Sequence, residues 1–551
     1  MVRRVFQYVY REVKGIHQAA YLLALFALGS QFLAIIRDRL LAHSFGAGRE
    51  LDLYYAAFRI PDILFVLFAS VLSVYVLLPF VAAGRYKTIL SQLFTVFLVL
   101  YTGLALALAA LAPWYVPLLF PGLTDDMTSL IQLQQVILLQ PLLLGISNIC
   151  GVITQFHHRF VLYAISPILY NIGIIFGVLV LYPSLGLVGL AWGVVLGAFG
   201  HLAVQWPFVR RSTLAFRPTR RIQWSEIFHV LQVALPRAAT LSLQQVVLLV
   251  LIGMATNLAA GSITVFQFAF NLQAVPLAII GMSYSVAAFP TLSRLSASGE
   301  IAAFNRQLLV ALRHIIFWSV PVIALVIVLR AQIVRVLLGS GMFDWGDTRL
   351  TAAVLAIFIV GLAAQASLLL LIRAFYASGR VLQPLFIALA STAVTIAGAV
   401  VTKYWYQTSP EWRQWLEGLL RLEGVVGTEV VVLAGAYVLG SVVQLVLMVI
   451  ITRQVFGVSL RPLGRLSLQA LAAAVVGGVV AYGALTFVVD GVNQEKFLGI
   501  ALQGLVAGLA GVAAVIATYF VLRAPELREI YRAFHNKIFR SKVITTAPDS
   551  L

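Results

Sequence analysis

The sequence lacks the residues on which several classes of protein depend. Cys150 is the single cysteine in 551 residues, which excludes an intramolecular disulfide and a metal cluster built from cysteines. The eight histidines show no spacing typical of metal ligands, and charged residues make up only 11% of the chain. Nucleotide-binding loops, nucleophile motifs and metal motifs are also missing. We therefore expect neither an enzyme nor a protein with a bound metal or cofactor.

Hydrophobic residues, in contrast, dominate the chain. They account for 61% of it, and the mean hydropathy is +0.98, far above the range of soluble domains. A membrane-crossing helix needs about 20 apolar residues, because the hydrocarbon core of a bilayer is about 30 Å thick. Fourteen runs of sufficient length are present, at residues 17–43, 53–83, 88–119, 127–155, 160–183, 185–209, 227–257, 262–290, 304–338, 350–376, 381–402, 429–456, 466–489 and 497–523. Since lipid cannot satisfy unpaired backbone amides, the sequence predicts an all-α polytopic membrane protein with about 14 transmembrane helices.

The formal net charge of +18 is unevenly distributed along the chain. When the loops alternate between the two sides and the N-terminus is inside, most of the 38 Lys and Arg fall on the inner side. They include the loop "RRSTLAFRPTRR" at 210–221 and the basic tail that follows residue 523. This bias predicts that both termini are cytoplasmic. Basic segments next to a membrane attract anionic lipids, whereas without a soluble domain to organise the charge we expect no nucleic-acid partner.

A weak internal repeat indicates how the helices are grouped. The stretch "GAGRELDLYYAAFRI" from Gly46 resembles "AAGSITVFQFAFNLQ" from Ala259, and each links the first two helices of a six-helix block. Parallel repeats of this kind are typical of transporters that bind substrate between two lobes. The expected divisions are an N-lobe of helices one to six (1–209), a basic cytoplasmic linker (210–226), a C-lobe of helices seven to twelve (227–456), helices thirteen and fourteen (457–523) and a basic cytoplasmic tail (524–551).

Polar residues in the first two helices form a candidate cavity wall. Helix two carries four of them at spacings of three, four and three, on one face: Asp52, Tyr55, Arg59 and Asp62. Helix one carries another four within an arc of about 120°: Ser30, Gln31, Arg37 and Asp38. We expect Arg37 to pair with Asp38 or Asp52, because a charge at membrane depth normally faces a partner or a wet cavity. An alternative stays open, in which Arg37, Arg59 and Asp62 lie at the membrane surface outside shorter spans.

Several sequence motifs resemble one family of membrane transporters. The run "SQFLAIIRD" ending at Asp38 is followed by "FGAG", Asp52 and "AFRIPDIL" at 57–64. Further motifs are "RFVLYAISPILYN" (159–171), "GLAWGVVLG" (189–197), "FPTLSRL" (289–295), "GMFDWGDTRLTAA" (341–353) and "RAFYASGRVLQP" (373–384). In this order they resemble the MurJ/MviN lipid II flippases of the multidrug/oligosaccharidyl-lipid/polysaccharide exporter superfamily. The resemblance implies two six-helix lobes around a central V-shaped cavity, plus two C-terminal helices that form a groove for an undecaprenyl chain.

The resemblance also implies roles for individual residues. Arg37 would hold a diphosphate, and three neutral side chains would donate hydrogen bonds to it: Ser30, Gln31 and Asn271. Asp38 would belong to the ion pairs of the cavity, and Arg59 with Asp52 and Asp62 would shape the outer gate.

This chain departs from the family pattern at several cavity positions. Gln31 and Asn271 stand where the family has arginines, Phe65 and Val66 replace paired arginines, and Ser70 replaces a glutamate. A diphosphate in a low-dielectric cavity needs several fixed cations or donors, so these changes weaken the case for the standard substrate.

The sequence predicts a flippase in the bacterial cytoplasmic membrane. It would move an undecaprenyl-diphosphate-linked glycan from the inner to the outer leaflet by alternating access, and lipid II is the substrate that we expect first. Cell-wall synthesis proteins are candidate partners. Three alternatives stay open: a flippase for another lipid-linked oligosaccharide of the O-antigen or exopolysaccharide type, a cation-coupled small-molecule exporter, and a transport-inactive scaffold. The exporter is disfavoured because no carboxylate lies between Glu226 and Glu300, whereas the missing arginines favour the scaffold.

The charge bias generates a test of the topology. In a Cys150→Ser background, a cysteine at Gln494 should react with an impermeant thiol reagent from outside, and a cysteine at Thr219 only from inside. The assay compares labelling of intact and permeabilised cells. Labelling of both cysteines from the same side would exclude the fourteen-span arrangement.

Overall fold

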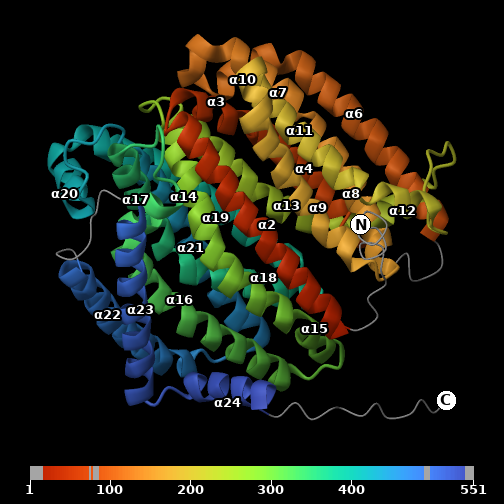
Figure 1. Ribbon diagram of the computed structural model, residues 1–551. Coiled ribbons are helices and arrows are strands. Elements are labelled where there is room, and N and C mark those ends of the chain that lie inside the picture. The colour runs from red at the N-terminus through yellow and green to blue at the C-terminus, as the bar shows by residue number, and fades with distance from the viewer. Residues whose placement is uncertain (1–15, 74–75, 78–85, 489–496, 540–551) are drawn as a thin grey trace. The chain divides into compact units, whose positions relative to one another are not determined.

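The computed structural model describes residues 16–73, 76–77, 86–488 and 497–539, and these residues contain helices but no strand (Figure 1). Part of the predicted basic cluster lies outside the described residues, namely Arg3, Arg4, Arg11 and Lys14 and the tail from residue 540 onward. The residue chosen for outside labelling, Gln494, lies outside them as well.

The first half of the chain contains twelve helical segments within the described residues. They are α2 (Ile16–Phe45), α3 (Arg49–Ala57), α4 (Arg59–Val71), α6 (Tyr86–Leu119), the 3₁₀ turn η1 (Pro121–Asp126), α7 (Met127–Ile137), α8 (Leu139–Phe156), α9 (Phe160–Phe176), the π-helical turn η2 (Gly177–Leu181), α10 (Tyr182–Leu185), α11 (Leu187–Ala203) and α12 (Trp206–Arg211).

The second half continues with helices of similar length. They are α13 (Trp224–Ala255), α14 (Ser262–Leu277), the π-helical turn η3 (Ala278–Met282), α15 (Ser283–Ala297), α16 (Ile301–Leu337), α17 (Trp345–Val360), α18 (Leu362–Ala377), α19 (Leu382–Thr408), α20 (Pro410–Leu420), α21 (Val430–Phe456), α22 (Arg461–Val488), α23 (Phe497–Val521) and α24 (Pro525–Phe539).

Most of the expected spans are present as long apolar helices. Among the described residues, 12 helices are long and apolar enough to cross a membrane, and the number is 13 when the pair α17 and α18, which bends by 45° at its break, is counted as one span. These helices confirm an all-α polytopic membrane protein. The first expected span lies within α2 and is not among them, so the number of fourteen stays a prediction.

Helix two differs from its expected extent of 53–83. It consists of α3 and α4, which are separated by Phe58, and α4 ends at Val71. The break lies near Pro61, which has no backbone N–H to donate and costs no helical hydrogen bond when it lies in the first turn of a helix. Pro61 lies in the first turn of α4, so the helix restarts just before it.

The described chain forms two compact units. Unit 1 comprises the described residues within Met1–Val275, Leu337–Phe358 and Arg380–Gln444, and unit 2 those within Pro276–Val336, Ile359–Gly379 and Leu445–Leu551. Every candidate site residue lies in unit 1. The predicted division into an N-lobe and a C-lobe at residues 210–226 remains a prediction.

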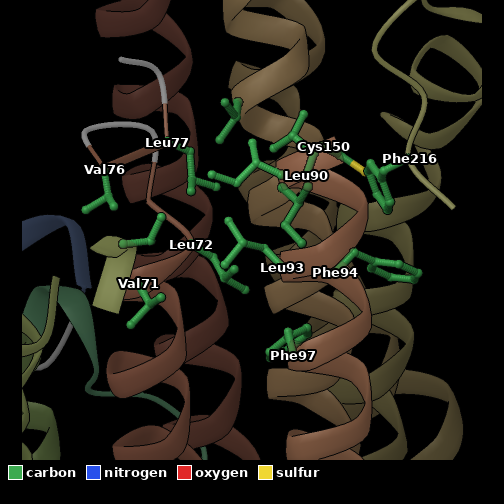
Figure 2. Close-up of a cluster of buried hydrophobic side chains, with 14 of the residues drawn as sticks. Val71, Leu72, Val76, Leu77, Leu90, Leu93, Phe94, Phe97, Cys150 and Phe216 are labelled. Atoms are coloured by element: carbon green, nitrogen blue, oxygen red, sulfur yellow. The ribbon is translucent and has the colours of Figure 1, made fainter. Parts of the chain in front are cut away.

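A large apolar cluster fills the part of unit 1 formed by α4, α6, α8 and the segment after α12. Leu90, Phe94 and Phe216 are among its members, and Cys150 lies between them with its thiol fully buried (Figure 2). The cysteine is free, as the sequence requires. Apolar contacts of this cluster therefore hold α4 against α6 and α8.

Unit 2 has its own core, in which α22 and α23 lie side by side and α24 follows (Figure 1). Tyr519 of α23 stacks on Phe317 of α16 with ring centroids 4.1 Å apart, and its hydroxyl donates to the Phe317 carbonyl. Arg313 of α16 donates from Nε to Glu526 of α24 over 2.7 Å. The buried carboxylate of Glu526 thus fixes the start of α24 to α16.

Glycines allow α9 and α11 to pack backbone against backbone in unit 1. Gly173 faces Gly197, and Gly177 faces Gly193, at positions where an added Cβ would collide with the main chain of the opposite helix. The spacing of four residues on both helices is the small-residue pattern that brings membrane helices into close contact.

This packing generates a prediction about stability. Gly193→Ala should lower the midpoint of thermal unfolding in detergent, because the new methyl group must push two backbones apart, at a cost of about 1 to 3 kcal/mol. The matched control is Gly200→Ala on the same helix, where the added Cβ would meet the Leu169 side chain at an ordinary 3.6 Å. An equal midpoint for both variants would contradict the close packing.

Candidate functional site

The centre of the candidate site is an ion pair between neighbouring residues of α2. Arg37 places Nη2 2.8 Å and Nε 2.9 Å from Oδ1 of Asp38. The side chain of Arg37 is 20% exposed and that of Asp38 is 11% exposed. Of the two partners expected from the sequence, the structure therefore pairs Arg37 with Asp38.

A residue of α9 holds the free side of the guanidinium. Asn171 accepts a hydrogen bond from Nη1 of Arg37 at 3.1 Å, and its own amide donates to the Ser30 hydroxyl at 3.2 Å and to the Pro167 carbonyl at 3.1 Å. Because both functional groups of the Asn171 amide are engaged, the amide cannot turn over without losing hydrogen bonds. Arg37 is thus held from two helices.

On the other side of Asp38 the hydrogen bonds continue into α14. Asn271 donates to Oδ2 of Asp38 at 3.0 Å, and Gln267 donates to the Asn271 carbonyl oxygen at 2.8 Å. Gln267 in turn accepts from Nη2 of Arg59 on α4 at 3.1 Å. The side chains form an unbroken chain from α9 through α2 and α14 to α4.

Arg59 ends this chain inside the protein. Its side chain is 5% exposed, its Nε donates to the Tyr55 carbonyl at 3.1 Å, and Nη2 lies 3.9 Å from Asp62. The side chain of Arg59 is therefore enclosed by protein, and its depth in the membrane stays a prediction.

Asp52 has a different partner from the expected ion pair. Its carboxylate accepts hydrogen bonds from the backbone amides of Gly261 at 2.7 Å and Thr264 at 2.8 Å, and from the Thr264 hydroxyl at 2.8 Å. These groups belong to the first turn of α14 and the residue just before it, where unpaired amides and the helix dipole favour a negative charge. Asp52 therefore caps α14 from another helix, and it is 3% exposed.

A small cavity of about 130 Å³ opens beside the central ion pair. Four of the candidate residues line it, together with apolar side chains of α2 and α14: Gln31, Arg37, Asp38 and Asn271. A cavity of this volume has room for several ordered waters. Arg37 and the two amide side chains are accessible from it, which makes it a place where a small anionic group meets one cation and neutral donors.

The structure brings most of the predicted site residues together, and it adds two that are not among the predicted site residues. Asn171 and Gln267 connect the predicted residues to one another. Each is a polar residue in the middle of an apolar run, which is the sequence signal that marks such a position. Within the described residues, no three His, Cys, Asp or Glu side chains gather into a group that could hold a metal ion.

Comparison with curated proteins finds relatives that are named lipid II flippases. A "Probable lipid II flippase MurJ" of Rhizobium tropici is 26% identical over 394 residues, which cover 68% of this chain and 73% of the relative. A protein of the same name from Thermotoga maritima is 27% identical over 388 residues, which cover 68% of this chain and 78% of the relative.

Solved structures share the fold. "Lipid II flippase MurJ, inward closed conformation" matches with a TM-score of 0.70 and 20% identity, over 91% of this chain and 99% of that one. An inward-facing multidrug resistance MATE family transporter of the MOP superfamily matches with a TM-score of 0.62 and 16% identity, over 78% of this chain and 94% of that one.

The family model that matches is "Lipid II flippase MurJ", over residues 41–501. Asp52, Arg59, Asp62 and Asn271 lie within the matched residues, whereas Ser30, Gln31, Arg37 and Asp38 precede them. Since the match extends over most of the sequence, the chain belongs to the MurJ lipid II flippase family.

Proposed function

We propose that the protein is a flippase that moves lipid II across the membrane. The observation that carries this proposal is membership of the family over residues 41–501, because the curated relatives that match most of the chain bear the name of lipid II flippases. The geometry of unit 1 adds a cation and hydrogen-bond donors beside a cavity, which are the groups that a diphosphate requires.

Arg37 binds the diphosphate in this proposal. It is the cation that lines the cavity, and its guanidinium offers planar pairs of N–H donors that match phosphate oxygens. Gln31 and Asn271 line the same cavity and act as neutral donors. Ser30 acts one step away, because its hydroxyl accepts from the Asn171 amide that holds Arg37.

Asp52, Arg59 and Asp62 act as the gate in this proposal. Two sets of hydrogen bonds join the α3–α4 segment to α14 over two helical turns. Asp52 binds Gly261 and Thr264, and Arg59 binds Gln267. Opening of this side requires that these contacts separate. Asp62 supports Arg59 as the nearest carboxylate, at 3.9 Å.

The protein resides in the bacterial cytoplasmic membrane with both termini in the cytoplasm, according to this proposal. The orientation rests on the bias of basic residues, which places Arg210, Arg211 and the exposed Arg528 and Arg532 of α24 at the inner surface. Anionic lipids are their partners there, and cell-wall synthesis proteins are further partners because they make and consume lipid II.

The scaffold is the second candidate function, and one observation favours it. Asp38 already neutralises Arg37, so the cavity of unit 1 carries little net positive charge for an anionic substrate. A flippase for a different oligosaccharide and a small-molecule exporter have less support, because both curated relatives bear the name of lipid II flippases.

Replacement of Arg37 tests the proposal. Arg37→Ala should abolish complementation of a strain depleted of its own lipid II flippase, because loss of a charge-assisted hydrogen bond of about 1.5 to 3 kcal/mol weakens binding roughly 10- to 100-fold. Arg37→Lys should restore transport in part, since the ammonium keeps the charge and loses the planar fork.

Two controls separate binding from folding. The Arg37→Ala variant leaves the Asp38 carboxylate without its cation, which can destabilise the fold. The double variant Arg37→Ala/Asp38→Asn removes that unpaired charge, so it should fold and still fail to transport. Arg294→Ala removes an exposed arginine of α15 and should complement fully. Membrane levels of every variant are measured by blot. Full complementation by Arg37→Ala would exclude the binding role, and failure of the unmutated protein would favour another glycan or the scaffold.

The driving force generates a second prediction. α13 and α14 contain a single carboxylate, Glu226, in the first turn of α13, so they offer no acidic proton or Na⁺ site within the membrane. Transport in proteoliposomes should therefore follow the membrane potential more than a Na⁺ gradient. Dependence on Na⁺ at constant potential is the result that contradicts this expectation.

A further inference from the structure

The helix α20, between the spans α19 and α21, has no part in the site described above. It begins with Pro410 at its first position and ends at Leu420, and the next residue, Arg421, has a left-handed φ of 60°. Because α19 ends at Thr408 and α21 begins at Val430, both ends of the α20 segment lie at the same membrane surface. An eleven-residue helix therefore connects two spans that a short polar loop could connect.

A carboxylate fixes α20 to the two spans. Oε1 of Glu417 accepts hydrogen bonds from the Tyr406 hydroxyl at 2.7 Å, the Thr428 hydroxyl at 2.7 Å and Nε of Arg413 at 3.0 Å. Tyr406 belongs to the last turns of α19, and Thr428 lies two residues before α21. Burial alone would raise the pKa of Glu417, but the hydrogen bonds from Thr428, Tyr406 and Arg413 lower it below its ordinary value. The anchor is ionised at neutral pH, so the orientation of α20 is fixed.

The fixed helix is amphipathic, and part of its apolar face is uncovered. Five apolar side chains fall within an arc of about 140°: Trp412, Trp415, Leu416, Leu419 and Leu420. Trp415 is 62% exposed and Leu419 is 61% exposed. Gln414 lies on the opposite arc and is also exposed, whereas Glu411, one turn before Trp415, borders the apolar arc.

The apolar face of α20 continues onto the adjoining span. Trp412 packs against Trp405 of α19, edge to face, with ring centroids 6.3 Å apart. Trp405 is 58% exposed and its neighbour Tyr404 is 64% exposed, in the last turn of a membrane-crossing helix. Trp and Tyr at this depth are typical of the boundary between hydrocarbon and headgroups.

We infer that α20 lies in the headgroup boundary of the bilayer, with Trp415 and Leu419 inserted into lipid and Gln414 facing water. The occupant of the exposed apolar face is phospholipid, because that face is continuous with the lipid-exposed aromatic residues at the end of α19. Amphipathic helices with tryptophan on one face and charges on the other bind at this boundary. In the proposed orientation the surface is that of the outer leaflet, so α20 fixes the depth of α19 and α21 on the side where a flipped lipid leaves.

Spin labels test this placement directly. In a Cys150→Ser background, single cysteines replace Trp415 and Leu419 on the apolar face and Gln414 on the opposite face. After reconstitution in liposomes, labels at 415 and 419 should be several-fold more accessible to oxygen than to a water-soluble nickel complex, and a label at 414 should show the reverse order. Equal nickel accessibility at all three positions would mean that α20 stands in water. Low accessibility of 415 and 419 to both reagents would mean that protein covers the face, and either result overturns the inference.

A second measurement keeps the native helix. Trp415→Phe removes one indole and retains an aromatic ring, so the difference in fluorescence between the native chain and this variant isolates Trp415. In liposomes of brominated phosphatidylcholine, that difference should be quenched by lipids brominated near the headgroup end of the acyl chain. An unquenched difference signal would overturn the insertion of Trp415, and a monodisperse elution profile of both proteins establishes that they are folded.

Discussion

The carboxylate of Asp38 accepts hydrogen bonds from Arg37 through one oxygen and from Asn271 through the other, and so joins α2 to a helix 233 residues further along the chain. An ion or amide without a partner inside a membrane protein costs several kcal/mol. Each neighbour of Asp38 is therefore constrained in turn. Asn271 can donate to Asp38 only with its carbonyl oxygen turned away, and Gln267 satisfies that oxygen. Gln267 then presents its own oxygen to Arg59, so one carboxylate fixes the orientation of two amides and a second cation.

Under the proposed function, the same carboxylate limits how the cavity binds an anion. Arg37 is neutralised by its neighbour, and the positions that surround the cavity add amide donors and no further cation. An incoming phosphate must therefore offer Arg37 hydrogen bonds at least as good as those from Asp38, or share the guanidinium with it. Asn171 keeps one edge of the guanidinium engaged in either case. Under the proposed function, such a site gains selectivity from geometry more than from net charge, because a planar guanidinium and two oriented amides fit tetrahedral oxyanions better than they fit other anions.

Hydropathy alone predicts the fold class, because lipid permits few alternatives to a helix for a long apolar run. Periodicity predicts that Asp52, Tyr55 and Arg59 share a face, and all three contact α14 in the structure. Their partners could not be predicted, since a helical wheel does not say which helix lies opposite. Asp52 caps α14 where an ion pair is expected, because the unpaired amides of a distant helix end compete for a carboxylate as strongly as an arginine does. Asn171 and Gln267 could not be singled out because uncharged amides in spans more often serve ordinary helix packing.

The residues of α14 that contact the first helices follow one another at the helical period. Thr264 meets Asp52 of α3, Gln267 meets Arg59 of α4, and Asn271 meets Asp38 of α2. Each contact lies about one turn from the next, so together they form a polar stripe along a helix that is mostly apolar. When α14 separates from the first helices at one end of the stripe, a buried polar group loses its hydrogen-bond partner. The free-energy cost of that loss falls only when water or substrate reaches the group. The contacts are therefore expected to break in order from the end that water enters, and Asn271 is the stripe residue that lines the cavity. If the contacts separate from the Asn271 end, the cavity becomes exposed on that side. The other end of α14 meanwhile stays capped by Asp52.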